Sequence, residues 1–135
     1  MTTVAQNAKI ILDLNGHTIT LKNDSVVQVG GKGLTIKDSV GNGGFIKSES
    51  NGVRGLFASF NDSATLTIDG GIFNGNYLVG KSANAETKMA VTVNGGTFKL
   101  DALIYSEITK TTISRTGGTF NIDVSDYSGS TSSDD

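Results

Sequence analysis

A short pattern recurs along this chain: an apolar residue, a Thr, a second apolar residue, a polar residue, two glycines and then an aromatic residue. It is clearest at residues 66–73 (LTIDGGIF) and 91–98 (VTVNGGTF). Taking the first apolar residue as an anchor gives five copies, at Leu12, Leu34, Leu66, Val91 and Ile113, spaced by 22, 32, 25 and 22 residues. A unit this short cannot bury its own apolar side chains, whereas stacked copies can. The repeat therefore predicts a solenoid.

The residue types of each copy favour strands. The chain has 18 Gly and no Pro, and its apolar runs alternate with Thr and other polar residues, which is typical of short strands joined by tight turns. No helical periodicity extends beyond two turns. We predict an all-β fold, a parallel β-helix of about five coils. One domain covers residues 1–127, and residues 128–135 form a polar tail that we expect to be flexible.

Alternation within each copy predicts which side chains form the core. The inward ladders comprise Leu12, Leu14, Leu34, Ile36, Leu66, Ile68, Val91, Val93 and Ile113. Seven residues after the anchor, a further apolar residue starts the next strand: Ile19, Phe73, Phe98 and Phe120, with Ile46 in this role if the second copy contains a five-residue insertion around Val40. The turn glycines are Gly70, Gly71, Gly95, Gly96, Gly117 and Gly118. At least one residue of each turn is expected to need a positive φ.

Composition argues against several classes of partner. The formal charge is −2, with 11 Lys and Arg against 13 Asp and Glu, which favours neither nucleic acid nor an anionic membrane. The chain has no Cys and a single His, His17, so we expect no disulfide, no metal site and no cofactor. His17 is interpreted as a solvated turn residue, and GGKG at 30–33 as a corner, because the spacing of a phosphate-binding loop is missing.

The two ends of such a stack carry strand edges that need protection. Arg115 stands where other copies have an apolar residue and is interpreted as part of a C-terminal cap. At the other end Ile10 and Ile11 enter the first coil directly. That edge is covered either by residues 1–9 or by a partner, and we expect a homo-oligomer.

The segment ILDLNGHTIT, residues 11–20, together with the later GGIF, GGTFKL and GGTFNIDVSDY, resembles the right-handed β-helix repeats of pectate-lyase-like surface proteins of gut bacteria and of structural proteins of their tailed phages. The resemblance covers most of residues 8–127. It implies a right-handed coil and a role as a fibre, decoration module or adhesive stalk. Trimers are frequent among such fibres.

An enzymatic role would require acidic or basic side chains gathered on an outer face. The first outward row is predicted to hold Asp13, Thr35, Thr67, Thr92 and Ser114, and the second Asn15, Lys37, Asp69, Asn94 and Thr116. Lys37 and Asp69 would form an exposed ion pair. Because no second acid lies beside Asp69, we predict no catalytic residues and no enzyme; a polysaccharide lyase or hydrolase is the least favoured alternative.

Four residues are candidate partner contacts. Phe57 and Phe60 cannot both point inward from one regular strand, so one of them is a surface contact unless a bend buries both. Lys81 and Lys88 lie within a lateral insertion, residues 80–90, and loops on a rigid scaffold often carry recognition. A glycan is an alternative ligand, although Tyr77 and Tyr105 fall within strands.

Together these observations predict a non-enzymatic structural protein, a phage virion component of the head-fibre or capsid-decoration kind, located on the capsid surface. The N-terminal residues lack the features of a signal peptide, which favours this reading over the alternative of an extracellular or cell-surface adhesin that binds carbohydrate.

Overall fold

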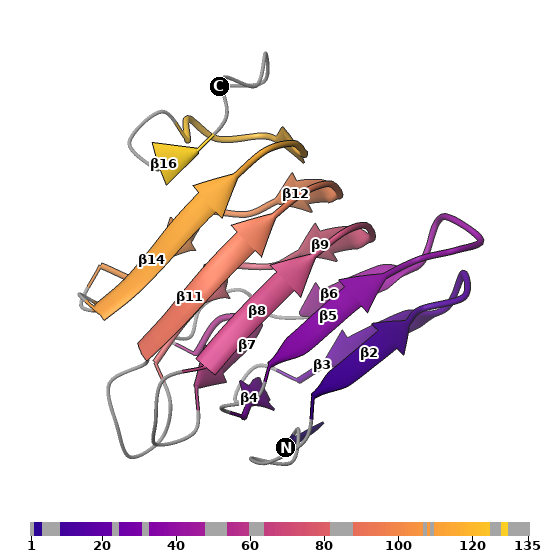
Figure 1. The fold of residues 1–135 in the computed structure, drawn as a ribbon, viewed down its shortest axis with the longest axis horizontal. Coiled ribbons are helices and arrows are strands. Elements are labelled where there is room, and N and C mark those ends of the chain that lie inside the picture. Colours follow the sequence, from indigo (N-terminus) through magenta and orange to yellow (C-terminus); the bar gives the residue numbers. More distant parts are fainter. Residues whose placement is uncertain are drawn as a thin grey trace.

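The computed structural model describes residues 2–3, 9–22, 25–30, 33–47, 54–59, 64–81, 88–106, 108, 110–124 and 128–129. The described residues contain strands, turns and bends but no helix, and the strands form three parallel sheets. Strands far apart in the sequence lie side by side and step regularly from the N-terminal to the C-terminal end (Figure 1). The chain is therefore a parallel β-solenoid.

Each sheet collects one strand from every coil. Sheet A contains β1 (Thr2–Thr3), β4 (Val27–Val29), β7 (Phe57–Ser59), β10 (Tyr77–Val79) and β13 (Ala102–Ile104). Sheet B contains β2 (Ile10–Asp13), β5 (Leu34–Lys37), β8 (Ala64–Ile68), β11 (Lys88–Val93), β14 (Lys110–Arg115) and β16 (Ser128–Gly129). Sheet C contains β3 (Thr18–Leu21), β6 (Gly44–Lys47), β9 (Ile72–Asn74), β12 (Thr97–Lys99) and β15 (Thr119–Phe120).

The five anchors predicted from the sequence lie on β2, β5, β8, β11 and β14, which are successive neighbours in sheet B. The prediction of about five coils is therefore confirmed: each of five coils contributes one anchor strand, and about four turns separate the first of these strands from the last. β16 pairs with β14 through Ser128 and Gly129, so strand pairing extends two residues beyond the predicted end of the domain at residue 127.

The register of sheet B agrees with the predicted repeat from the second coil onward. Leu34, Leu66, Val91 and Ile113 are paired in succession. In the first coil, however, Ile10 pairs with Leu34, and Leu12 pairs with Ile36. The predicted alignment of Leu12 with Leu34 is therefore wrong by two residues, because the corner after β2 is longer than the later corners.

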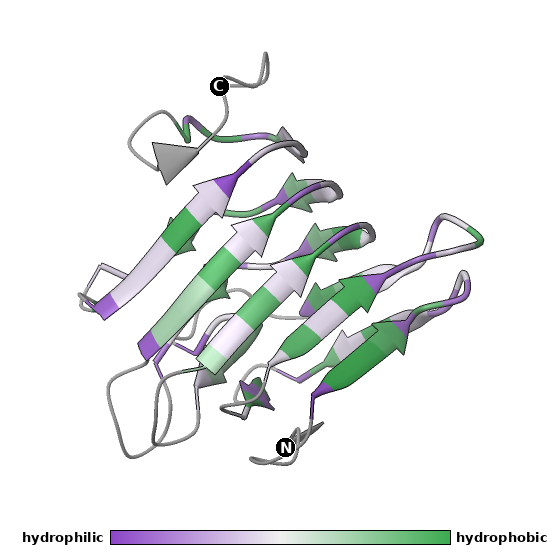
Figure 2. Ribbon diagram, viewed as in Figure 1, coloured by the Kyte–Doolittle hydropathy of each residue, from purple (hydrophilic) through white to green (hydrophobic). Residues whose placement is uncertain are grey.

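The predicted ladder residues line the interior. Leu14, Leu34, Ile36, Leu66, Ile68, Val91, Val93 and Ile113 are buried, and Leu12 is half-buried and packs against them. Along β8, and along β11 from Val91 to Val93, apolar and polar residues alternate (Figure 2). This alternation follows from the two-residue period of a strand, which sends successive side chains to opposite faces.

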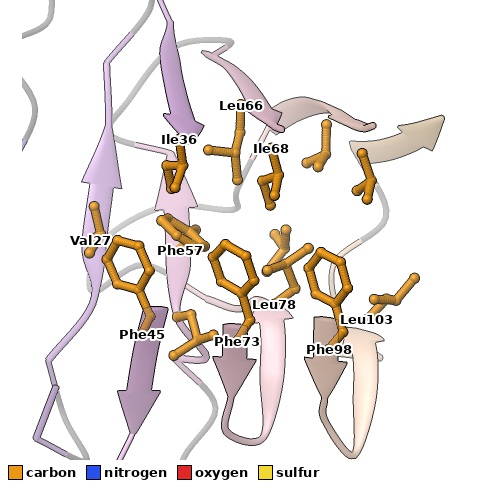
Figure 3. Packing of buried hydrophobic residues seen from close by; sticks show 14 of the residues in the cluster. Val27, Ile36, Phe45, Phe57, Leu66, Ile68, Phe73, Leu78, Phe98 and Leu103 are labelled. Carbon is orange, nitrogen blue, oxygen red and sulfur yellow. The ribbon is translucent and has the colours of Figure 1, made fainter. Parts of the chain in front are cut away.

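A column of stacked phenylalanines runs through the core. The ring centroids are 5.6 Å apart for Phe45 and Phe73, 4.9 Å for Phe73 and Phe98, and 4.7 Å for Phe98 and Phe120. Figure 3 shows the first three of these rings in line beneath the aliphatic ladder of sheet B. Phe45 pairs with Phe73, whereas Ile46 is 40% exposed. The assignment of Ile46 to this ladder is thus wrong, since the insertion before it is one residue shorter than assumed.

The structure explains why an aromatic residue follows the double glycine. Gly96 has φ of 103°, a value that residues with a Cβ rarely adopt. A Cβ built on Gly96 would lie 3.2 Å from the ring of Phe98. Gly71 and Gly118 repeat this arrangement with Phe73 and Phe120. Each ring therefore packs over the glycine of its own corner.

Candidate functional site

The outer face of sheet B carries rows of small hydroxyl side chains. The register places Ile11, Thr35, Thr67, Thr92 and Ser114 in one row. Asp13 was predicted to start this row, but it pairs with Lys37 and so belongs to the next outward row. Ile11, which is 64% exposed, starts the first row instead. The row is thus apolar at its N-terminal end and hydroxylated over the next four strands.

A second outward row lies where the strands of sheet B end. Asp13 starts this row, where Asn15 was predicted, and its partner on the neighbouring strand is Lys37. Asp69 accepts a hydrogen bond of 2.8 Å from the side chain of Asn94. Asn94 in turn accepts one of 2.8 Å from the Thr116 hydroxyl. Asp69 is thus bound to Asn94, and its ion pair with Lys37 stays a prediction.

Two carboxylates organise the first two corners between sheets B and C. Asp13 Oδ1 accepts the backbone N–H groups of Asn15 and Ser39, each at 3.0 Å. Asp38 Oδ1 accepts the N–H of Gly16 at 2.8 Å, and its Oδ2 accepts that of Gly43 at 2.7 Å. Both carboxylates therefore link the corner of one coil to the corner of the next.

These hydrogen bonds favour the charged carboxylates. The N–H of Ser39, followed by its hydroxyl and by the N–H of Asn15, lowers the pKa of Asp13 from its usual value. The N–H of Gly16 lowers the pKa of Asp38, with smaller contributions from the N–H groups of Gly43, Gly41 and Val40. Neither carboxyl is thereby prepared to act as a general acid near neutral pH.

Two shallow depressions lie on the outer face of sheet B. One, of about 360 Å³, is lined by Ala64, Thr65, Lys88, Met89, Ala90, Lys110 and Thr112. The other, of about 230 Å³, is lined by Lys9, Gly33, Leu34, Thr35, Thr65 and Thr67. Lys88 and Lys110 are directly paired on β11 and β14. Hydroxyl and ammonium groups are thus the polar side-chain groups that line these two depressions.

The candidate contact residues divide between the core and the surface. Phe57 is fully buried, with its ring 5.2 Å from that of Phe45 in an edge-to-face arrangement. It is therefore not a surface contact, because β7 directs it into the aromatic column. Phe60 lies outside the described residues. Lys81 and Lys88 are exposed.

The other residues singled out in the sequence are one histidine and two tyrosines. His17 is exposed in the first corner, with its backbone N–H bonded to Leu14. Tyr77 and Tyr105 are half-buried, with ring centroids 5.3 Å apart. Within the described part of the chain, no three His, Cys, Asp or Glu side chains gather as a metal site would require. That part also contains no helix long and apolar enough to cross a membrane.

The buried ionic residue that sequence reasoning missed is Lys47. Its side chain is 3% exposed, and Nζ donates to the carbonyl oxygens of Ser25 and Gly55, each at 2.6 Å. Lys47 pairs with the buried Leu21, so its equivalence to an inward leucine could have indicated that it points inside. Arg115 is likewise buried, at 2% exposure, opposite Val93 on one side and Gly129 on the other.

Comparison of the chain with protein-family models, with curated protein sequences and with solved structures finds no match.

Proposed function

We propose that this chain is a non-enzymatic structural module, a rigid solenoid that holds its outer faces and its N-terminal end in fixed positions for protein partners. The observation that carries this proposal is the continuous stack itself. Six strands in succession are joined by backbone hydrogen bonds in sheet B, and an aromatic column runs beneath them from β6 to β15. Such a body resists bending because every coil is hydrogen-bonded to its neighbours.

The distribution of exposed apolar residues supports an assembled state. Among the described residues, the exposed large hydrophobic side chains are Ile11, Val40 and Ile46, and all three lie in the first two coils. The inward residues Ile10, Leu12 and Ile19 of the first coil are only partly buried. An apolar region at one end of a stack is where we place the contact with a second copy or another protein.

The pectate-lyase-like resemblance supplies the finer part of the proposal. It implies a right-handed coil and the setting of a phage virion, with the chain acting as a head fibre or capsid-decoration protein on the capsid surface. A homo-oligomer, trimeric in the manner of many fibres, follows from the same resemblance.

The test is the solution mass of the purified chain, measured by light scattering after size exclusion. We expect a stable homo-oligomer whose mass falls to that of one chain when Ile11 and Ile46 are both replaced by Ser. A matched control replaces Thr20 and Thr67, which are outward residues of the same sheets, by Ser. A monomeric wild-type chain over the accessible concentration range contradicts the proposal.

A second candidate function is that of a carbohydrate-binding adhesin module. The observation that favours it is the depression beside Lys88 and Lys110, whose walls include Thr65 and Thr112. Hydroxyls and ammonium groups hydrogen-bond sugar oxygens well. Binding to an array of glycans should weaken in Lys88→Ala and persist in Lys99→Ala, which changes an exposed lysine of sheet C. An array with no bound glycan excludes this candidate.

A further inference from the structure

The two long corners of the solenoid each contain an Asn-Gly dipeptide, Asn15-Gly16 and Asn42-Gly43. Asn15 has φ of 50° and Asn42 has φ of 68°, and among the described residues these are the two positions with positive φ that are not glycine. Both asparagines are exposed. Asn-Gly is the dipeptide most prone to spontaneous deamidation, because glycine leaves its backbone nitrogen unshielded by a side chain.

The fold nevertheless requires glycine after each asparagine. A Cβ on Gly43 would lie 2.6 Å from the backbone oxygen of His17, a distance that no real Cβ contact reaches. Gly16 has φ of 79°, where a side chain is strained. Asparagine is in turn among the few residues that adopt the left-handed conformation readily. The labile dipeptide is therefore a requirement of both corners.

One carboxylate holds both of the reactive nitrogens. The backbone nitrogen of Gly16 donates to Asp38 Oδ1 at 2.8 Å, and that of Gly43 donates to Asp38 Oδ2 at 2.7 Å. We propose that Asn15 and Asn42 are deamidation sites of this chain and that Asp38 protects both of them by binding the adjacent glycine N–H groups.

The chemistry explains why a carboxylate at this position protects. The glycine nitrogen must lose its proton to base and attack the asparagine Cγ. A bond from nitrogen to Cγ forms, the bond from Cγ to Nδ2 breaks, and the leaving nitrogen takes up a proton and departs as ammonia. Water then opens the cyclic imide to aspartate or isoaspartate. Loss of the N–H proton next to a carboxylate places two negative charges together, which disfavours the reactive anion.

Among the described residues, two other Asn-Gly dipeptides serve as internal references. The nitrogen of Gly75, after Asn74, donates to the neutral carbonyl of Lys99 at 3.1 Å. The nitrogen of Gly95, after Asn94, donates to the carbonyl of Ile68 at 3.3 Å. Neither contacts Asp38, so their conversion should not respond to a change at that residue.

The experiment compares the wild-type chain with Asp38→Ala during incubation at mildly alkaline pH, with conversion at each Asn-Gly followed by peptide mapping and mass spectrometry. Conversion of Asn15 and Asn42 should rise about tenfold in the variant, the order expected when a charge-assisted hydrogen bond no longer opposes a reaction. Conversion of Asn74 and Asn94 should stay unchanged.

The matched control is Asp13→Ala, which removes hydrogen bonds to Asn15 and Ser39 in the same corners but leaves both glycine nitrogens bound. An equal rise in both variants would show that corner rigidity protects, and would overturn the proposal. So would an unchanged or slower conversion in Asp38→Ala, because the carboxylate would then be inert or act as a base.

A measurement on the wild-type chain alone covers the case in which Asp38→Ala does not fold. Conversion at Asn15 and Asn42 is compared in buffer and in denaturing urea. Protection of about tenfold or more in the folded chain is expected; equal rates in the two conditions overturn the proposal.

Discussion

The first two coils and the last three coils build the same stack with different corners. Between sheets B and C, the early corners take four and six residues, 14–17 and 38–43, and are held by the carboxylates of Asp13 and Asp38. The later corners take three residues, 69–71, 94–96 and 116–118, and carry a double glycine under a phenylalanine ring. A short corner is fixed by backbone conformation and packing, whereas a long corner needs side-chain acceptors for its N–H groups.

The difference extends to the surface. Ile11, Val40 and Ile46, the exposed large hydrophobic residues of the described chain, belong to the early coils. The late coils end instead with the buried Arg115 beneath β16. Among the described residues, the late coils therefore have more regular corners and leave no large hydrophobic side chain exposed. The early coils are where we expect a partner.

The largest effect is predicted for Leu66→Asp in the central strand β8. Leu66 is fully buried between Leu34 and Val91, and an unpaired carboxylate there cannot be accommodated. We expect loss of the cooperative thermal transition in circular dichroism. Thr67→Asp, which changes the adjacent outward residue, should keep it. A Leu66→Asp variant with the wild-type melting temperature would contradict the register.

A smaller effect is predicted for Phe73→Ala, which interrupts the aromatic column between the two types of coil. The free energy of unfolding should fall by about 3–5 kcal/mol, the range for a large core residue replaced by Ala. Asn74→Ala, at the adjacent exposed position of the same strand, should change it by about 0.5 kcal/mol or less. Urea denaturation measures both, and equal losses would contradict the position of Phe73 in the buried column.

Replacing Lys47 by Met tests how the second coil is fastened to its neighbours. The variant keeps most of the volume but leaves the carbonyls of Ser25 and Gly55 without the Lys47 ammonium donor. We expect a loss of about 1–3 kcal/mol, the cost of leaving buried polar groups unsatisfied. Lys99→Met, at an exposed position of sheet C, is the control; equal stability of both variants would show that the buried ammonium contributes nothing.

The smallest effect is predicted for acid, and it should fall on the early coils. Because hydrogen bonds lower the pKa of Asp13 and Asp38 in the folded chain, their contribution to stability is present above the unfolded-state pKa and is lost as the pH falls through the folded-state pKa. Between about pH 5 and pH 2 the wild-type chain should therefore lose more stability than the D13N/D38N double variant. Parallel losses in urea denaturation at each pH would contradict this assignment.

Much of the fold could be predicted from the sequence because the late coils repeat almost without change. Leu66 with Val91 and Ile68 with Val93 keep the same spacing to their glycines, so alternation and period together fix the register. In the early coils the corner length varies, and composition alone does not reveal it. That is why Leu12 was misaligned by two residues.

The polar features of the candidate site were less predictable. The roles of Asp13 and Asp38 depend on backbone N–H groups brought together by the coil, and the sequence carries no direct signal of such contacts. Lys47 was missed because lysine is usually exposed. Its burial depends on Gly75 in the next coil, where a Cβ would come within 3.2 Å of the Lys47 Cβ.

The most direct test of the stacked register is a set of through-space NMR contacts among the six phenylalanines, labelled selectively on their rings. The structure predicts contacts from Phe45 to Phe73, from Phe73 to Phe98 and from Phe98 to Phe120, with Phe57 also close to Phe45. Phe45 and Phe120, at opposite ends of the column, should show none. Absence of the Phe73 to Phe98 contact, or a direct contact between Phe45 and Phe120, would contradict the solenoid described above.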